Sequence, residues 1–329
     1  MVGVATGATP APSARTAPSV VALGGGHGLA VSLRALRRVT DQLTAIVGVA
    51  DDGGSSGRLR QEFGILPPGD LRMAVAALCA DEPSARDWAE VLQFRFPGDG
   101  ELGGHAVGNV LMAALWERTG DLVAGLDELG SLVGAVGRVL PCSLEPLGIR
   151  ARIRGHDPAE PDAVGEVGGQ VQIATTPGRV ERVWLEPADA RPCAQALQAV
   201  ADAGVIILGP GSWFTSLMPH LVLPELGAAV AGAPARKIVV LNLDPQEGET
   251  GDLSPAEHIE ALSAHAPELR CDVVLADQRH VGATSTSTRR ELMAACRDWG
   301  AELILADVAG LGDRHDPHKL ARAFGTVLT

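Results

Sequence analysis

The stretch ADDGGSSGRLRQEFGILPPGD, residues 50–70, decides the fold, and it directly follows the apolar run TAIVGV at residues 44–49. The apolar run predicts a buried strand. A strand that ends in acids, glycines, hydroxyls and arginines is typical of the carboxyl edge of an α/β sheet, where ligands bind. A solvated turn also uses Asp, Gly and Ser. However, residues 51–60 contain three glycines, two serines, two aspartates and two arginines, which is more than a turn requires.

The polar groups of this stretch suit a phosphorylated or sugar-containing ligand. Glycines let the backbone approach a ligand closely, and backbone N–H groups and hydroxyls hold anions. An arginine matches a phosphate with two parallel hydrogen bonds, and paired aspartates bind Mg²⁺ or ribose hydroxyls. The candidate ligand-binding residues here are Asp51, Asp52, Gly53, Gly54, Ser55, Ser56 and Arg58. Asp51 and Asp52 are also the candidate Mg²⁺ ligands, and Mg²⁺ is the one cofactor that the sequence suggests.

A second glycine-rich loop, GGGHG, lies between a short apolar run at residues 19–23 and a helical pattern at residues 29–39. Strand, glycine loop and helix form the first half of a nucleotide-binding unit, and the start of such a helix attracts anions. The loop departs from both GxGxxG and the Walker A pattern. Its candidate ligand-binding residues are Gly24, Gly25, Gly26, His27 and Gly28. His27 is equally interpreted as a loop histidine that bonds to the backbone.

The middle of the chain adds four candidate residues. Asp70 is expected to cap a helix at residues 71–79 and to contact the ligand. Arg72 lies in the first turn of that helix, where the dipole disfavours a cation, so it is expected to have an anionic partner. His105 and Asn109 are spaced i, i+4 and share one face if a helix begins near Gly104, which suits a sugar or phosphate contact as well as ordinary capping.

The second half repeats the strand–loop pattern. A strand at residues 205–208 leads into GPGSWFTS, and a strand at residues 237–243 leads into a polar segment. The candidate residues of these two loops are Gly209, Pro210, Gly211, Ser212, Phe214, Thr215, Ser216, Asn242, Gln246, Glu249 and Thr250. Helices are expected at residues 84–93, 121–133, 192–203, 255–265 and 288–299, with strands at 271–276 and 302–306. The pair His315 and His318 is interpreted as a surface loop rather than a metal site.

These elements predict a doubly wound, mostly parallel Rossmann-like sheet, in one domain at residues 19–329 behind a disordered tail at 1–18. Residues 140–187 contain short β-like runs at 149–153, 170–174 and 180–185, so they predict a small β-hairpin insertion whose turn is mobile. The net charge of −13 argues against a nucleic-acid binder. Five scattered cysteines without CxxC and no apolar run of membrane-spanning length indicate a cytoplasmic protein.

The motifs GGGHGL, ADDGGSSGRLR, PPGDLR, GHAVGN, GPGSWFTS and NLDPQEGET, in this order, resemble the YvcK-type gluconeogenesis factors of the CofD-like family. That family also contains 2-phospho-L-lactate transferase. The resemblance runs from residue 19 to beyond residue 276. It implies a cytoplasmic protein that binds UDP-sugars, such as UDP-N-acetylglucosamine or UDP-glucose, and supports cell shape and envelope precursor supply during gluconeogenic growth. It also implies self-association and a regulatory protein partner.

Two alternatives stay open. The transferase relatives imply a metal-dependent transfer of a phospholactyl group from a guanine nucleotide, with Asp51 and Asp52 as metal ligands. A dinucleotide oxidoreductase is less favoured because the glycine fingerprint is imperfect. The sequence also departs from the family pattern, since His27 replaces a threonine, Phe214 replaces a tyrosine and Met73 replaces an asparagine. The loss of the tyrosine hydroxyl would alter nucleotide affinity or base preference.

Overall fold

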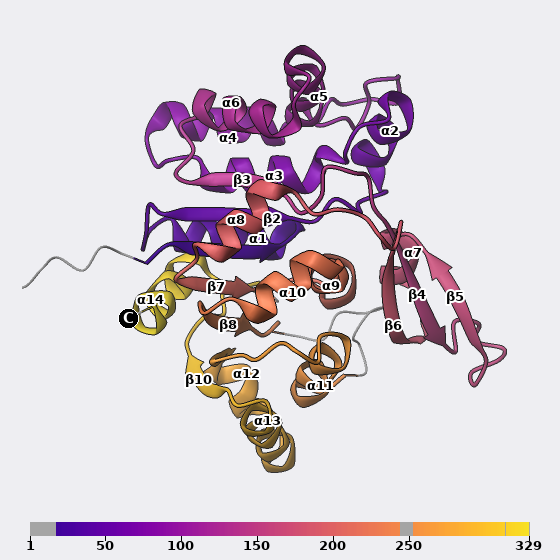
Figure 1. Ribbon diagram of the computed structural model, residues 1–329, viewed down its shortest axis with the longest axis vertical. Helices are drawn as coiled ribbons and strands as arrows, with labels where there is room; N and C mark the ends of the chain where they lie inside the picture. The colour runs from indigo at the N-terminus through magenta and orange to yellow at the C-terminus, as the bar shows by residue number, and fades with distance from the viewer. Residues whose placement is uncertain (1–17, 244–252, 313, 329) are drawn as a thin grey trace, which may run out of the picture.

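A central sheet of seven parallel strands organises the protein, as Figure 1 shows. The computed structural model describes residues 18–243, 253–312 and 314–328. The strand order is β10-β9-β8-β7-β1-β2-β3, and every neighbouring pair is parallel. The strands are β1 (Val20–Gly24), β2 (Leu43–Val47), β3 (Arg138–Pro141), β7 (Val205–Leu208), β8 (Arg236–Val240), β9 (Val273–Asp277) and β10 (Glu302–Ala306).

Helices cover both faces of the sheet, which confirms the doubly wound prediction. α1 packs between α3 and α14 on one face, and α8, α10 and α9 pack in series on the other. This division follows from right-handed crossovers, because the strand order grows outwards from β1 in opposite directions. The helices are α1 (Gly26–Leu36), α2 (Gly54–Phe63), α3 (Pro68–Leu78), α4 (Pro83–Gln93), α5 (Val107–Thr119), α6 (Leu122–Leu132), α7 (Gln170–Thr175), α8 (Ala194–Ala201), α9 (Met218–Val222), α10 (Pro224–Gly232), α11 (Pro255–His265), α12 (Gln278–Ala283), α13 (Thr286–Asp298) and α14 (Pro317–Val327), with a π-helical turn η1 (Trp213–Leu217) before α9.

The central strands are apolar throughout because helices bury them on both sides. Every residue of β1 and of β7 is buried, as expected for the middle of a parallel sheet. The strand predicted at residues 205–208 and the helix predicted at residues 255–265 have the predicted bounds. A capping box between Ser254 and Glu257 marks the start of that helix.

A separate antiparallel sheet, β5-β4-β6, forms the insertion at the right of Figure 1. Its strands are β4 (Gly148–Arg154), β5 (Val164–Gly168) and β6 (Arg179–Glu186). The insertion was predicted, but two of its details were wrong. The expected strand at residues 170–174 is helix α7, and the segment interpreted as a mobile turn contains β5. In addition, the last two residues of β3 fall inside the predicted insertion boundary, yet β3 pairs with β2 in the main sheet.

Across the described ranges, no single helix is long and apolar enough to cross a membrane. One bent pair, Trp213–Val222 with Pro224–Gly232, passes the length and composition test only when the two helices are joined across an 84° bend. Most side chains of η1 and α9 within this pair are buried in the protein.

Candidate functional site

The predicted glycine loops lie side by side where neighbouring strands β7, β1 and β2 end. Gly28 shows how close the first and third loops are, since a side chain there would collide with the carbonyl oxygen of Pro210 and the Cα atom of Gly211. Only glycine permits this approach. The loop at residues 24–28 and the loop at residues 209–216 therefore form one continuous backbone surface at the carboxyl edge of the sheet.

Three helices begin near these loops with no capping bond from their own N-cap residue. Side chains from elsewhere reach two of them, since Asp70 accepts from the Gly26 N–H of α1 and Ser56 accepts from the Gly69 N–H of α3. The residues at the cap positions of α1, α2 and α3 are Gly25, Gly53 and Pro67, and none forms a side-chain capping bond. The stretch that decides the fold contains α2 from Gly54 to Phe63 and the start of α3 at Pro68, so most of it is helical rather than an extended loop. Free backbone N–H groups and the positive ends of helix dipoles attract anions. This arrangement suits the phosphates of a nucleotide.

Asp70 is in the first turn of α3, not at its N-cap as predicted, because the helix begins at Pro68. Its carboxylate accepts a hydrogen bond from the Gly26 N–H at the start of α1. Desolvation by the surrounding protein, together with the neighbouring Asp51 carboxylate, raises the pKa of Asp70 to about 7. A carboxyl group with a pKa near neutral pH can release its proton when a cation binds, or accept a hydrogen bond from a ligand hydroxyl.

Arg72 is the buried cation of the site. Its residue is only 3% exposed, and burial lowers the pKa of its guanidinium to about 10, with a further contribution from Arg95. Asp70 and Asp51 oppose this shift and keep Arg72 charged at neutral pH. The anionic partner that the sequence predicts is not an ion pair in the described structure, since Asp70 and Asp51 act on Arg72 only through their charge. The Nε and Nη1 atoms of Arg72 have no hydrogen-bond partner in the part of the chain that the structure describes.

Asp51 and Asp52 face different neighbours. The Oδ1 atom of Asp51 accepts from the Gly53 N–H at 3.0 Å, and its other oxygen lies beside Gly69 at the start of α3. The Oδ1 atom of Asp52 instead accepts from the N–H of Val171 on α7, at 3.4 Å. The charge of Asp51 raises the pKa of Asp70, so these two carboxylates are neighbours and have the oxygen atoms that a hard cation prefers. No cluster of three or more His, Cys, Asp or Glu side chains with metal-binding geometry occurs among the described residues.

Ser55, His105 and Asn109 come together in a buried network. The Ser55 hydroxyl lies 3.0 Å from His105 Nδ1 and accepts from Asn109 Nδ2 at 3.0 Å. All three residues are at most 5% exposed. The helix-face prediction was wrong, since α5 begins at Val107 and His105 precedes it. The network holds α2 against α5, so these side chains position the site rather than line its surface.

Ser56 and Arg58, the remaining candidates of α2, brace neighbouring loops. The Ser56 hydroxyl accepts from the Gly69 N–H at 3.0 Å and fixes the start of α3 beside α2. Arg58 is exposed and donates to the Gly103 carbonyl at 2.8 Å. Sequence analysis missed that Gln170 of α7 also reaches the site, where its Nε2 donates to the Thr215 carbonyl at 2.6 Å.

Asn242 fixes the shape of the third loop. Its side-chain amide accepts from the Gly211 N–H and donates to the Gly211 carbonyl, both at 2.9 Å. Ser212 accepts from the Thr215 N–H as the cap of η1, and the two hydroxyls bond to each other. Ser216 is partly exposed, whereas Phe214 is 1% exposed and packs edge-on against His265, so its ring offers no free stacking face. Gln246, Glu249 and Thr250 lie outside the described residues.

His27 is exposed at the mouth of the first loop, within a group of arginines. Burial lowers the pKa of His27, and Arg314, Arg34 and Arg72 lower it further. Sequence analysis did not include Arg34 or Arg314. The only feature of the sequence that could have pointed to Arg314 is its position next to His315. Because that segment was interpreted as a surface loop, Arg314 was not considered as a site residue. Together these cations make the loop electropositive in an acidic protein.

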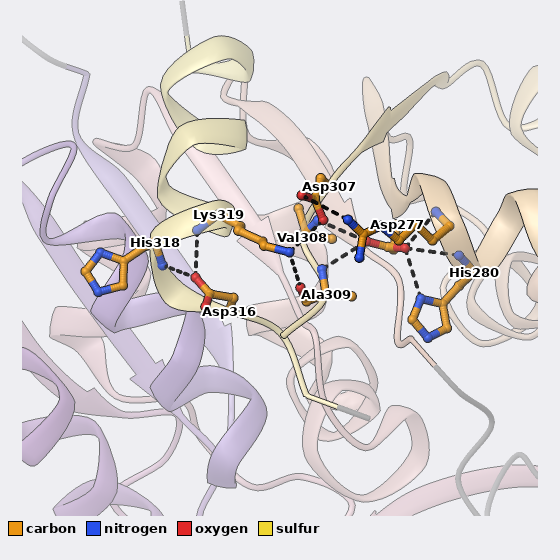
Figure 2. Close-up of polar contacts among 9 residues, drawn as sticks. Asp277, His280, Asp307, Val308, Ala309, Asp316, His318 and Lys319 are labelled. Atoms are coloured by element: carbon orange, nitrogen blue, oxygen red, sulfur yellow. Dashed lines mark hydrogen bonds and ion pairs between the residues drawn. The ribbon is translucent and has the colours of Figure 1, made fainter. Parts of the chain in front are cut away.

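The loop that contains His315 is anchored by Asp277, at the end of β9 (Figure 2). Asp277 accepts hydrogen bonds from the backbone N–H groups of residues 279, 280, 308 and 309 and from the His280 ring. Burial raises its pKa, but the hydrogen bonds outweigh burial and hold the pKa well below the usual range. His315 is half-buried beside this cluster, and burial lowers its pKa to about 4. In the same figure, Asp316 accepts from the N–H groups of His318 and Lys319 as the cap of α14.

Comparisons with known proteins agree with this architecture. The family profile described as 2-phospho-L-lactate transferase CofD matches residues 20–308. A protein of Mycobacterium leprae is 48% identical over 94% of this chain and 86% of its own length. The Bacillus subtilis gluconeogenesis factor is 35% identical over 92% of this chain and 96% of its own length.

A crystal structure of a UPF0052-family protein from Bacillus halodurans superposes with a TM-score of 0.79, at 33% identity over 92% of this chain and 97% of that chain. The residues that match the family profile, 20–308, include the glycine loops, α1 to α3 and the small sheet. The chain therefore belongs to the CofD family, and its relatives within that family include proteins named gluconeogenesis factor.

Proposed function

We propose that this protein binds a UDP-sugar at the carboxyl edge of its main sheet and acts as a regulatory protein in gluconeogenic growth. The observation that carries the proposal is Arg72, a buried cation with two unpartnered nitrogens among the described residues. A buried charged group without a partner is costly, and an anionic ligand would remove that cost. The starts of α1, α2 and α3, whose own N-cap residues form no capping bond, lie near the loops of the same sheet edge, which suits a diphosphate.

Different residues of the site would bind different parts of the ligand. The loop at residues 24–28, with Arg72 and Arg314 nearby, supplies the positive surface for the diphosphate. Asp51 and Asp70 supply oxygen ligands for Mg²⁺, whose chemistry would be to neutralise and orient the diphosphate, and they would otherwise accept sugar or ribose hydroxyls. The names of the relatives support a role in gluconeogenesis, and the motif resemblance supports the UDP-sugar, the cytoplasmic location, self-association and a link to cell morphogenesis and envelope precursor supply.

A metal-dependent transferase is the second candidate, because the neighbouring Asp51 and Asp70 carboxylates supply oxygen atoms of the kind that Mg²⁺ binds. In that case the bound nucleotide would contain guanine and the site would transfer a phospholactyl group. The two candidates differ in base preference and in turnover, so they are separable by measurement.

The experiment is calorimetric titration of the full chain with UDP-N-acetylglucosamine, with and without Mg²⁺, and with GDP and NAD as comparison ligands. Arg72→Met is expected to weaken UDP-sugar binding by about tenfold or more, the scale of a hydrogen-bonded charge. Arg60→Met is the matched control, since Arg60 is half-buried nearby and donates to the Leu147 carbonyl at 2.9 Å. Equal affinity in the two variants would contradict the proposal. Magnesium-dependent GDP binding with turnover would replace it by the transferase.

A further inference from the structure

The small sheet has one face packed on the protein and one face exposed to solvent. Along β4, buried apolar residues alternate with three arginines that point away from the core. These arginines are Arg150, Arg152 and Arg154. Figure 1 shows this sheet projecting from the body of the molecule beside α7. We call this exposed surface, together with its cross-strand neighbours Arg179, Arg182 and Trp184, the arginine face.

Cross-strand pairing brings like charges together on the arginine face. Arg152 lies opposite Arg182 on β6, and Arg154 lies opposite Arg179. Like charges directly opposite each other in an antiparallel pair are destabilising. The whole chain has a net charge of −13, so two consecutive arginine pairs on one short sheet do not follow from its composition. This arrangement costs stability in the isolated protein.

The glutamates on this face neutralise only part of the charge. Arg154 bonds to Glu181 at 2.8 Å, and Arg150 lies 3.6 Å from Glu166. Arg179 lies 3.6 Å from Glu257 of α11. By contrast, Arg152 and Arg182 form no side-chain ion pair or hydrogen bond with any residue that the structure describes. The centre of the face therefore holds two adjacent cations that form no ion pair among the described residues, and the one carboxylate in register with them, Glu166 opposite Arg152, lies nearer to Arg150.

We propose that the arginine face is a docking surface for an acidic segment of another protein. Arginine pairs with a carboxylate through two parallel hydrogen bonds, so Arg152 and Arg182 can each hold one acidic side chain. Residues of β4 that share a face repeat about every 7 Å, which is also the repeat of alternate side chains in an extended peptide. Trp184, partly exposed opposite Arg150, adds an aromatic contact at one end.

A nucleic acid fits this face less well. The arginine column of β4 is only about 13 Å long, and three glutamates, Glu166, Glu181 and Glu186, lie along the two outer strands. A continuous phosphate backbone would meet these carboxylates, whereas a peptide can place neutral side chains beside them. The small, interrupted charge pattern thus favours an acidic peptide.

The arginine face is also connected to the nucleotide site through α7. β5 leads directly into α7, whose Val171 N–H reaches Asp52 and whose Gln170 side chain reaches the Thr215 carbonyl. The Gly169 N–H, between β5 and α7, bonds to the Ile149 carbonyl of β4. A protein docked on the arginine face would therefore contact the same small sheet that holds α7, and with it Gln170 and Val171, in place. The docking itself does not depend on the identity of the nucleotide.

The test uses the full chain and a fluorescein-labelled peptide of alternating glutamate and serine, measured by fluorescence anisotropy at low salt. The double variant Arg152→Glu/Arg182→Glu is expected to weaken binding by about tenfold or more, as for loss of close charge pairs. The matched control is Arg289→Glu/Arg290→Glu, two exposed arginines of α13 that change the net charge equally. Circular dichroism of each variant checks folding. The intrinsic fluorescence of Trp184 is expected to change on binding, and Trp184→Phe should remove that change.

Each result decides the proposal. Selective loss of binding in the Arg152/Arg182 variant, with the glutamine version of the peptide inactive, supports it. An equal loss in the α13 control would show attraction to bulk charge only and would overturn it. Tighter binding of a single-stranded oligonucleotide, or of phosphatidylserine vesicles, would also overturn it, as would failure of the wild-type chain to bind the acidic peptide.

Discussion

Two aspartates near the carboxyl edge of the sheet, Asp70 and Asp277, show how the same side chain serves binding in one place and structure in another. Asp277 receives four backbone N–H bonds and one histidine bond, and its pKa is lowered. Asp70 receives a bond from Gly26, lies beside a second carboxylate, and has its pKa raised to about 7. A satisfied charge stabilises the fold, whereas an under-satisfied one stores the free energy that a ligand can release.

The comparison also separates the cations near the two aspartates. Arg72 is buried with unpartnered nitrogens, while Lys319 near Asp277 donates to both the Asp307 carboxylate and the Ala309 carbonyl. The cluster drawn in Figure 2 is thus closed by the protein itself. In the Asp70–Arg72 region, by contrast, two nitrogens of Arg72 keep no partner among the described residues. Four predictions test this distinction, and they follow in order of expected effect.

The largest effect is expected from Asp277→Ala. This change leaves the N–H groups of Val308 and Ala309 without their acceptor in a buried site. Loss of a buried charged acceptor with several bonds should reduce the free energy of unfolding by about 3–5 kcal/mol. Urea denaturation at neutral pH measures it. A loss below about 1 kcal/mol would show that the Asp277 cluster is not the structural anchor that its bonds indicate.

Asp70→Asn is expected to act in the opposite direction. The native state keeps the Asp70 proton up to about pH 7, whereas the unfolded chain releases it near pH 4, so the native state binds more protons in this window. Stability from this group is therefore lost as pH rises from about 4 to 7. The asparagine variant should be more stable than the wild type by about 2–4 kcal/mol at pH 8, with the difference vanishing near pH 4.

The control for this prediction is Asp52→Asn, which changes an exposed carboxylate whose neighbours lie on α7. Thermal unfolding of both variants across the same pH range separates a site-specific effect from a general change in charge. If Asp70→Asn were destabilising at pH 8, the Asp70 carboxyl would be satisfied after all, and the contrast with Asp277 would fail.

Asp70 and Asp277 also show which parts of the structure can be predicted from the sequence. The strands and the glycine loops at their ends follow from apolar runs and turn residues, because parallel strands bring their ends together. The neighbourhood of Asp51 and Asp70 does not, since the sequence paired Asp51 with Asp52 and Asp70 lies inside α3. Asp277 was missed, since its structural role depends on hydrogen bonds from N–H groups some thirty residues later in the chain. The helix α7 was taken for a strand because six residues, QVQIAT, show no reliable period, and its position on Asp52 and Thr215 decides its structure.

An intermediate effect is expected from Ser55→Ala. The hydroxyl is the shared partner of His105 Nδ1 and Asn109 Nδ2, so its removal leaves both without a bond in a buried place. Destabilisation by about 1–2 kcal/mol is expected, with ligand affinity reduced only through looser positioning of α2. Ser216→Ala, at a partly exposed hydroxyl of the third loop, is the matched control. A strong loss of affinity at full stability would instead place Ser55 in contact with the ligand.

The smallest effect at neutral pH is expected from His258→Phe. This substitution tests whether a buried polar atom without a hydrogen-bond partner is enough to identify a binding site. His258 stacks on Trp213 with ring centroids 5.4 Å apart, and its buried Nε2 has no partner within the described ranges. Burial lowers its pKa to about 4, so between pH 6.5 and 4 the unfolded state binds more protons and stability falls as pH falls.

Phenylalanine keeps the stack and removes the titration. The variant should differ from the wild type by less than about 1 kcal/mol at pH 7.5 and be more stable by about 2 kcal/mol at pH 5. Its UDP-sugar affinity should be unchanged, because phenylalanine preserves the stack on the Trp213 ring and the proposed ligand contacts do not include His258. Reduced affinity would mean that the ligand site extends to α11, and that an unpartnered polar atom is a sufficient sign of binding in this protein.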